Sequence, residues 1–116
     1  MTIERKHPGA RMSQIVIHGD TVYLAGQVAE QAPAAPAGEQ TAAILKKIDG
    51  LLAEAGSDKS KLLSATIWLA DMRDYDAVNE VWDAWVPEGA APARACVEAK
   101  LAFAKYTVEI GVIAGR

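Results

Sequence analysis

The segment at residues 39–55 constrains the fold most, because it has the period of a helix, whereas the segments on either side of it have the period of β-strands. Apolar side chains recur there at helical spacing and form one face, while charged side chains occupy the other. The apolar members are Ile44, Ile48, Leu51, Leu52 and Ala55. Gly56 follows as a stop signal. A shorter helix is expected from Asp74, a candidate N-cap, to about Val86, where Pro87 ends it.

Several β-rich segments flank these helices. The first two, residues 14–18 and 21–25, are separated by Gly19-Asp20, a loop of the kind that closes tight hairpins. The others are residues 62–70, 92–98 and 106–114. Residues 30–38 have no period and are expected to form a mobile loop. The order β, β, α, β, α, β, β predicts an α+β sandwich, in which both helices pack on one face of a mixed sheet.

The apolar strand residues are too numerous for the helix-covered face alone. The strand at 62–70 is expected to place Trp68 on one side and four apolar residues on the other: Leu63, Ala65, Ile67 and Leu69. Six side chains do not all fit beneath the helices: Ile15, Ile17, Val22, Leu24, Trp68 and Ile113. We therefore expect the uncovered face to meet other subunits, in a closed ring or a dimer, with ligand clefts between subunits.

Strand parity identifies a candidate site. Arg94, Cys96 and Glu98 share one face of their strand. Glu109 is the lone acid on the second face of the last strand. If these strands pair as a hairpin turning around residues 101–105, Arg94 and Glu109 come roughly opposite each other. They would then be either an anchor and a proton carrier for a small carboxylic acid, since arginine holds a carboxylate through two parallel hydrogen bonds, or a structural ion pair.

Composition narrows the functional class. The 12 basic and 15 acidic residues include no long basic run, so we expect no nucleic-acid partner. One cysteine, no secretory segment and no apolar run near about 18 residues indicate a single cytoplasmic domain, residues 1–116, with no disulfide or membrane span. His7 and His18 lack a second ligand at metal spacing, so we expect no metal.

Five short motifs follow one another in the order and spacing of a known family. They are Tyr23-Leu24-Ala25-Gly26-Gln27, Gln40-Thr41, Val78-Asn79-Glu80-Val81-Trp82, Pro92-Ala93-Arg94 and Val108-Glu109-Ile110. Together they resemble the RidA family, also called the YjgF family, over nearly the whole chain. Residues 7–13, 83–86 and 105–109 resemble its shorter YoaB-like branch.

This resemblance implies a chorismate-mutase-like fold, a homotrimer and ligand clefts between neighbouring subunits. RidA-type members hydrolyse reactive 2-imino or enamino acids to 2-keto acids and ammonia, without a metal or cofactor. On this chain Arg94 would clamp the substrate carboxylate, the Cys96 backbone would face the imine nitrogen, and Glu109 would handle the water. Further residues expected at the site are Asn79, Ala25, Gly26, Met12 and Arg11.

Two positions depart from the family pattern. Arg11-Met12 stands where better-known members carry Pro-Tyr, and Ala25-Gly26-Gln27 stands where they carry Ser-Gly-Gln. Arg11 is then either a second cation or a surface residue, and Asn79 either contacts substrate or bridges backbone. Three functions stay open: an imine deaminase, a non-catalytic binder of 2-keto acids, and an endoribonuclease or translation inhibitor, which the net charge of −3 disfavours.

Overall fold

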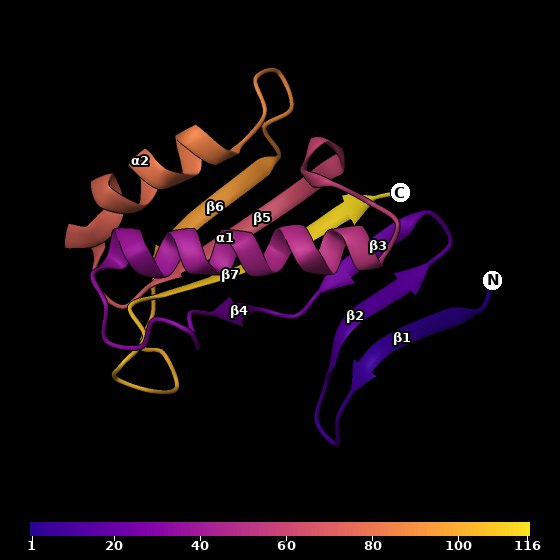
Figure 1. Ribbon diagram of the computed structural model, residues 1–116, viewed down its shortest axis with the longest axis horizontal. Helices are drawn as coiled ribbons and strands as arrows, with labels where there is room; N and C mark the ends of the chain where they lie inside the picture. The colour runs from indigo at the N-terminus through magenta and orange to yellow at the C-terminus, as the bar shows by residue number, and fades with distance from the viewer.

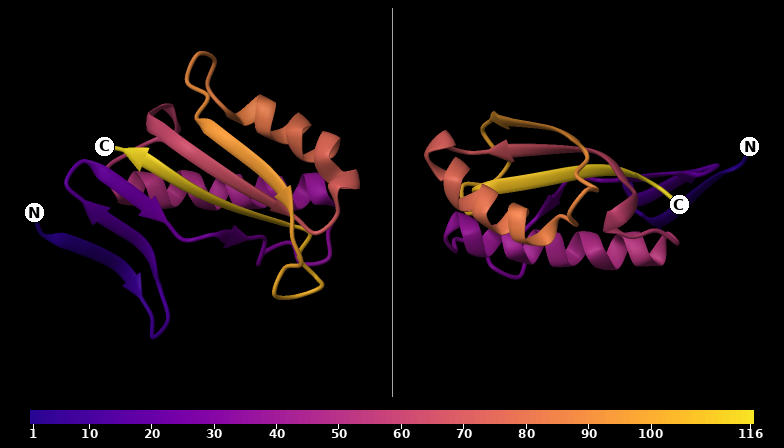
Figure 2. Two further views of the ribbon diagram at one scale, coloured as in Figure 1. Left: turned by 180° about the vertical axis from the view of Figure 1, so that it is seen from behind. Right: turned by 90° about the horizontal axis from the view of Figure 1, so that it is seen from above.

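In the computed structural model, which describes residues 1–116, a mixed seven-stranded sheet carries two helices on one face (Figures 1 and 2). The strands are β1 (Ile3–Pro8), β2 (Ser13–His18), β3 (Thr21–Leu24), β4 (Gln27–Val28), β5 (Leu62–Leu69), β6 (Ala93–Glu98) and β7 (Val108–Gly115), and the helices are α1 (Ala37–Glu54) and α2 (Tyr75–Trp85). The order across the sheet is β1-β2-β3-β7-β5-β6, with β4 also beside β7. The expected α+β sandwich is confirmed.

Helix α1 begins two residues before the expected start. Its first turn closes on Pro36, whose carbonyl accepts a hydrogen bond from the Gln40 backbone N–H at 3.0 Å. The predicted face is buried at Ile44, Ile48 and Leu52, and the chain leaves the helix through Gly56 at a φ of +78°. That positive φ costs glycine little, so Gly56 ends the helix as predicted.

Helix α2 is capped differently from the expectation. Asp74 occupies the N-cap position, but its side chain makes no capping hydrogen bond. The carboxylate that caps this region is Asp71, which accepts from the Arg73 N–H at 2.9 Å and closes a short 3-10 turn, Met72–Asp74, before the helix. Within α2, Val78 and Trp82 are buried in the core.

Strand β5 departs from a simple alternation at its start. Leu63 is 54% exposed, whereas Leu62 is buried beside Ala65 and the rest of the core. The register between β5 and β7 shifts between Leu62 and Ser64. An extra residue in one strand reverses the parity of the residues before it, so the expectation that Leu63 faces the core was wrong.

Two strands have no counterpart in the expected order. β1 pairs only with β2 and is mostly exposed, so its polar sequence lacks the alternation that identifies a strand. β4 is two residues long and pairs with β7 through Ile110 and Glu109. Two residues are too few to show the alternation that identifies a strand. The pairing of β4 with β7 nevertheless places the turn at Gly26 beside β7.

The expected hairpin between the last two strands does not form. β6 pairs in parallel with β5, and β7 pairs antiparallel with the other edge of β5. The cause is helix α2, which returns the chain along the sheet between β5 and β6 as in other strand-helix-strand units. β5 therefore separates β6 from β7.

The sheet face away from the helices is partly apolar. Of the six side chains considered above, Ile15, Ile17, Val22 and Leu24 are buried under the helices, while Trp68 and Ile113 lie on the open face. Val16 and Tyr23 continue the row of Ile113 across β2 and β3. Neither helix combines the length and apolarity that a membrane span requires.

Candidate functional site

Glu109 lies on the open face of β7, directly opposite Trp68 of β5. Its carboxylate rests on Gly26, in the turn between β3 and β4. A Cβ built on Gly26 would lie 3.1 Å from the Glu109 carboxyl carbon and nearer still to Oε2, too close for a real side chain. Glycine at position 26 is thus what allows the Glu109 carboxylate to occupy this place.

A cavity of about 320 Å³ opens beside Glu109. Its other lining residues come from the β1–β2 turn, β4, the segment after it and the loop between β6 and β7: Met12, Gly26, Val28, Glu30, Leu101, Ala102, Phe103 and Tyr106. Three predicted site residues, Met12, Gly26 and Glu109, therefore share one cavity. Its volume is near the lower end of the range for small-molecule sites.

Arg94 lies elsewhere, on the helix-facing side of β6. Its Nη1 donates a 2.8 Å hydrogen bond to Oδ1 of Asn79 on α2, and its guanidinium carbon is 5.5 Å from the centroid of the Trp82 ring. Arg94 forms no ion pair within the chain. Helix α2 thus orients the guanidinium while leaving its other donors available to a carboxylate.

The two central residues of the predicted site are on opposite faces of the sheet. Arg94 is in register with Ala65, which is buried beneath the helices, whereas Glu109 is in register with Trp68 on the open face. The predicted juxtaposition of Arg94 and Glu109 within one chain was wrong, and so was the alternative of an ion pair between them. The parallel pairing of β5 with β6 places a strand between the two residues, and the register puts them on opposite faces, because Ala65 and Trp68 point to opposite sides of β5.

Cys96 shares the face of Arg94, as strand parity predicts, and packs against the core. Burial raises the pKa of the Cys96 thiol, and the nearby positive charge of Arg94 opposes that rise only in part. The thiol therefore stays protonated near neutral pH, where it is a poor nucleophile.

The remaining predicted site residues, Arg11, Ala25 and Asn79, have different surroundings in the structure. Arg11 is exposed in the β1–β2 turn and does not line the Glu109 cavity. Ala25 acts through its backbone, since its N–H donates to the Gln14 carbonyl at 3.0 Å and its carbonyl accepts from the Gln27 amide. Asn79 bridges no backbone and instead orients Arg94.

Gln40 is a residue whose role the sequence did not reveal. It is completely buried at the start of α1. Its Nε2 donates to the carbonyls of Ala35 and Lys105, at 2.9 and 3.1 Å, and its Oε1 accepts from the Thr107 N–H at 2.9 Å. This Gln40 clasp ties the segment before α1 and the start of β7 to one helix. The signal in the sequence that could have indicated this role is a polar residue, Gln40, at a position of the helix that is expected to be buried.

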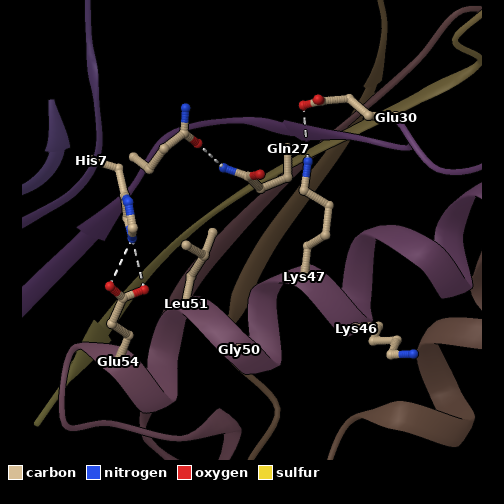
Figure 3. Close-up of a pocket in the computed structure, with 9 residues that line it drawn as sticks. His7, Gln27, Glu30, Lys46, Lys47, Gly50, Leu51 and Glu54 are labelled. Carbon is tan, nitrogen blue, oxygen red and sulfur yellow. Dashed lines mark hydrogen bonds and ion pairs between the residues drawn. The ribbon is translucent and has the colours of Figure 1, made fainter. Parts of the chain in front are cut away.

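A second, more polar groove lies between α1 and the strands β1, β2 and β4 (Figure 3). Its charged side chains are mostly paired: His7 bonds to Glu54 at 2.7 Å, and Lys47 bonds to Glu30 at 3.1 Å. None of the residues expected at the site lines this groove. With its cations largely neutralised, it offers a weaker carboxylate site than Arg94.

Comparison with known proteins identifies the class. Residues 2–115 match the family model described as Endoribonuclease L-PSP, so the chain belongs to this family, which is the RidA or YjgF family. Within it the chain is YoaB-like: it is 50% identical over 114 residues to the RutC family protein YoaB of Escherichia coli, covering 98% of each chain.

More distant relatives agree with this assignment. A crystal structure of a YjgF family member from Neisseria meningitidis has a TM-score of 0.94 and 46% identity, covering 100% of this chain and 96% of that one. The mouse 2-iminobutanoate/2-iminopropanoate deaminase is 34% identical over 107 residues, covering 88% of this chain and 78% of the mouse protein.

Proposed function

We propose that this protein hydrolyses reactive 2-imino and enamino acids to 2-keto acids and ammonia, in clefts between neighbouring subunits of a homotrimer. Family membership supports the reaction, because a relative 34% identical in sequence is named a 2-iminobutanoate/2-iminopropanoate deaminase. The reaction also needs little from the protein, since an imine is already electrophilic and requires mainly an oriented carboxylate, a water molecule and a route for protons.

The observation that carries the proposal is the separation of Arg94 from Glu109. Each has the surroundings of a ligand-binding group. Asn79 orients the Arg94 guanidinium through one hydrogen bond and leaves its other donors free, and Glu109 lines a cavity. In one chain the sheet lies between them. A cleft between two copies lets the Arg94 of one chain approach the Glu109 of the next. The apolar open face supports association of this kind.

The proposed chemistry divides the work between the two residues. Arg94 holds the substrate carboxylate through two parallel hydrogen bonds and so fixes the position of C2. Glu109 accepts a proton from water as the water oxygen bonds to C2, and that proton passes to the nitrogen. Glu109 next takes the hydroxyl proton of the resulting carbinolamine and passes it to the amino group, and the C–N bond breaks as the C=O bond forms, releasing ammonia and the 2-keto acid.

The first test measures imine hydrolysis with 2-iminopropanoate and 2-iminobutanoate, generated in place by an amino-acid oxidase. We expect the wild type to accelerate hydrolysis, and Arg94→Ala to lose at least about a hundredfold in kcat/KM because the carboxylate is no longer positioned. Arg94→Lys is the matched control, since it keeps the charge and loses the planar fork. Unchanged turnover in Arg94→Ala would remove Arg94 from the site.

Subunit mixing tests whether the site is shared. Arg94→Ala and Glu109→Gln subunits are each expected to be impaired alone. Reassembled together at equal amounts, they should recover up to about a quarter of wild-type turnover, because that fraction of shared clefts holds both native residues. No recovery in verified mixed oligomers would indicate that both residues act from the same chain.

The alternative function is non-catalytic binding of 2-keto acids. Met12 and Ala25 stand where the family pattern has a tyrosine and a serine, so two hydroxyl groups are missing from the proposed cleft. Binding of 2-oxobutanoate that depends on Arg94, without any acceleration of imine hydrolysis, would favour this alternative.

A further inference from the structure

The wall of the Glu109 cavity is more apolar than a site for very small acids requires. Glu109 and Glu30 are its only charged lining residues, and the Lys47 ammonium pairs with Glu30 at 3.1 Å. The apolar members are Met12, Val28, Leu101, Ala102, Phe103 and Tyr106. The surroundings of Glu109 therefore favour a neutral hydrocarbon group over a charged one.

Met12 and Phe103 form the outer part of this wall. They are 57% and 62% exposed. They come from segments far apart in sequence, the β1–β2 turn and the β6–β7 loop, and both line the same cavity. Exposed apolar side chains that converge on one cavity are typical of a binding site.

The Phe103 side of the wall is held in place by its neighbours. The Phe103 ring meets the Tyr106 ring edge to face, with centroids 6.2 Å apart, and the Tyr106 N–H donates to the Phe103 carbonyl at 3.1 Å. Tyr106 is buried, and the preceding carbonyl, that of Lys105, is bound by the Gln40 clasp. An anchored wall discriminates between ligand shapes better than a free loop does.

We propose that the preferred substrates are 2-imino acids with a large neutral apolar side chain, such as those formed from leucine, methionine or phenylalanine, and that Met12 and Phe103 determine this specificity. The substrate class rests on the proposed function. In this arrangement the carboxylate lies on Arg94, the imine carbon lies near Glu109, and the side chain enters the apolar part of the cavity. Contact with Met12 and Phe103 removes apolar surface from water on both sides.

The experiment compares kcat/KM for imines generated from leucine, methionine and phenylalanine with kcat/KM for imines generated from alanine and 2-aminobutanoate. We expect the wild type to prefer the large group by at least about tenfold, a ratio that one or two buried methylene groups can supply. Phe103→Ala and Met12→Ala should each lower that ratio, and Phe103→Leu should keep most of it. Met72→Ala, which removes an exposed apolar side chain outside the cavity, is the control and should leave the ratio unchanged.

Equilibrium binding separates this inference from the proposed reaction. Calorimetry with 4-methyl-2-oxopentanoate, phenylpyruvate and pyruvate reports side-chain preference without turnover. Tighter binding of the two large keto acids, reduced by Phe103→Ala, supports the inference even if no imine is hydrolysed, an outcome that overturns only the deaminase proposal. Equal or weaker binding of the large keto acids, or a ratio that Phe103→Ala does not change, overturns the inference whether or not imines are hydrolysed. A preference for imines with cationic side chains, generated from lysine or arginine, overturns it as well.

Discussion

At the scale of single residues, Gly26 is constrained by the side chain of Glu109. The Glu109 carboxylate occupies the space that any side chain at position 26 would need. This carboxylate is at the end of the flexible Glu109 side chain, so a methyl group added at position 26 displaces the carboxylate before it disturbs the sheet. Under the proposed function, a side chain at position 26 would therefore affect turnover more than folding.

We predict that Gly26→Ala lowers kcat/KM by about a hundredfold, as expected when a reacting group moves by about 1 Å. Gly50→Ala is the matched control, because Gly50 lies within α1 with no atom near its missing Cβ. It should stabilise the protein by about 0.5–1 kcal/mol and leave turnover unchanged. Imine hydrolysis and urea unfolding measure the two effects. Wild-type turnover in Gly26→Ala would contradict the assigned place of Glu109.

The neighbours of Arg94 show which contacts of single residues cannot be predicted from the sequence. The motifs drew attention to Asn79 and Arg94 separately, and parity correctly grouped Arg94 with Cys96. The hydrogen bond between Asn79 and Arg94 joins a helix to a strand, and no local pattern encodes it. The same holds for the contact of Glu109 with Gly26.

At the scale of elements, the Gln40 clasp connects helix α1 to the segment that precedes it and to the segment that leads into β7. Three hydrogen bonds from one buried amide satisfy backbone groups that have no strand or helix partner there. Without the amide, the Ala35 carbonyl and the Thr107 N–H would lose this partner, and the Lys105 carbonyl would keep only its hydrogen bond from the Ala34 N–H.

We predict that Gln40→Met, which keeps the side-chain volume and removes the hydrogen bonds, lowers the free energy of unfolding by about 2–4 kcal/mol. Gln31→Met changes an exposed glutamine and should stay within about 0.5 kcal/mol of the wild type. Urea unfolding at fixed protein concentration gives both values. A loss in Gln40→Met no larger than that in Gln31→Met would mean that the clasp contributes nothing to stability.

The errors in the expected elements have specific causes. Helix α1 and the hairpin at Gly19-Asp20 follow from local period and turn residues, and both are confirmed. Strand β1 was missed because both of its faces are largely polar and exposed. Leu63 was assigned to the wrong face because a register shift reverses parity, and a register shift depends on the partner strand.

At the scale of the whole molecule, the open sheet face carries apolar side chains that have no covering layer within one chain. Trp68, Ile113 and Tyr23 lie on it, and Tyr23 is 43% exposed. Association of copies through this face would bury that apolar surface and would complete the site proposed between Arg94 and Glu109.

We predict a mass in solution of about three times 12.3 kDa, measured by light scattering. Ile113→Lys should shift the protein toward monomer and lower turnover, because the charge would be buried at the subunit contact. Ala42→Lys adds the same charge on the exposed side of α1 and should leave the mass unchanged. A monomeric wild type would rule out a cleft shared between subunits.

The sequence by itself determined both helices, the strands that have a clear period or turn signal, the α+β class and the family, because period, turn chemistry and short motifs depend on neighbours along the chain. Only the tertiary structure decided that β5 lies between β6 and β7, and that the register places Arg94 beside Ala65 and Glu109 beside Trp68, on opposite faces of the sheet. Strand order depends on how helix α2 packs as it carries the chain from β5 to β6. That packing is a long-range contact which no window of sequence contains.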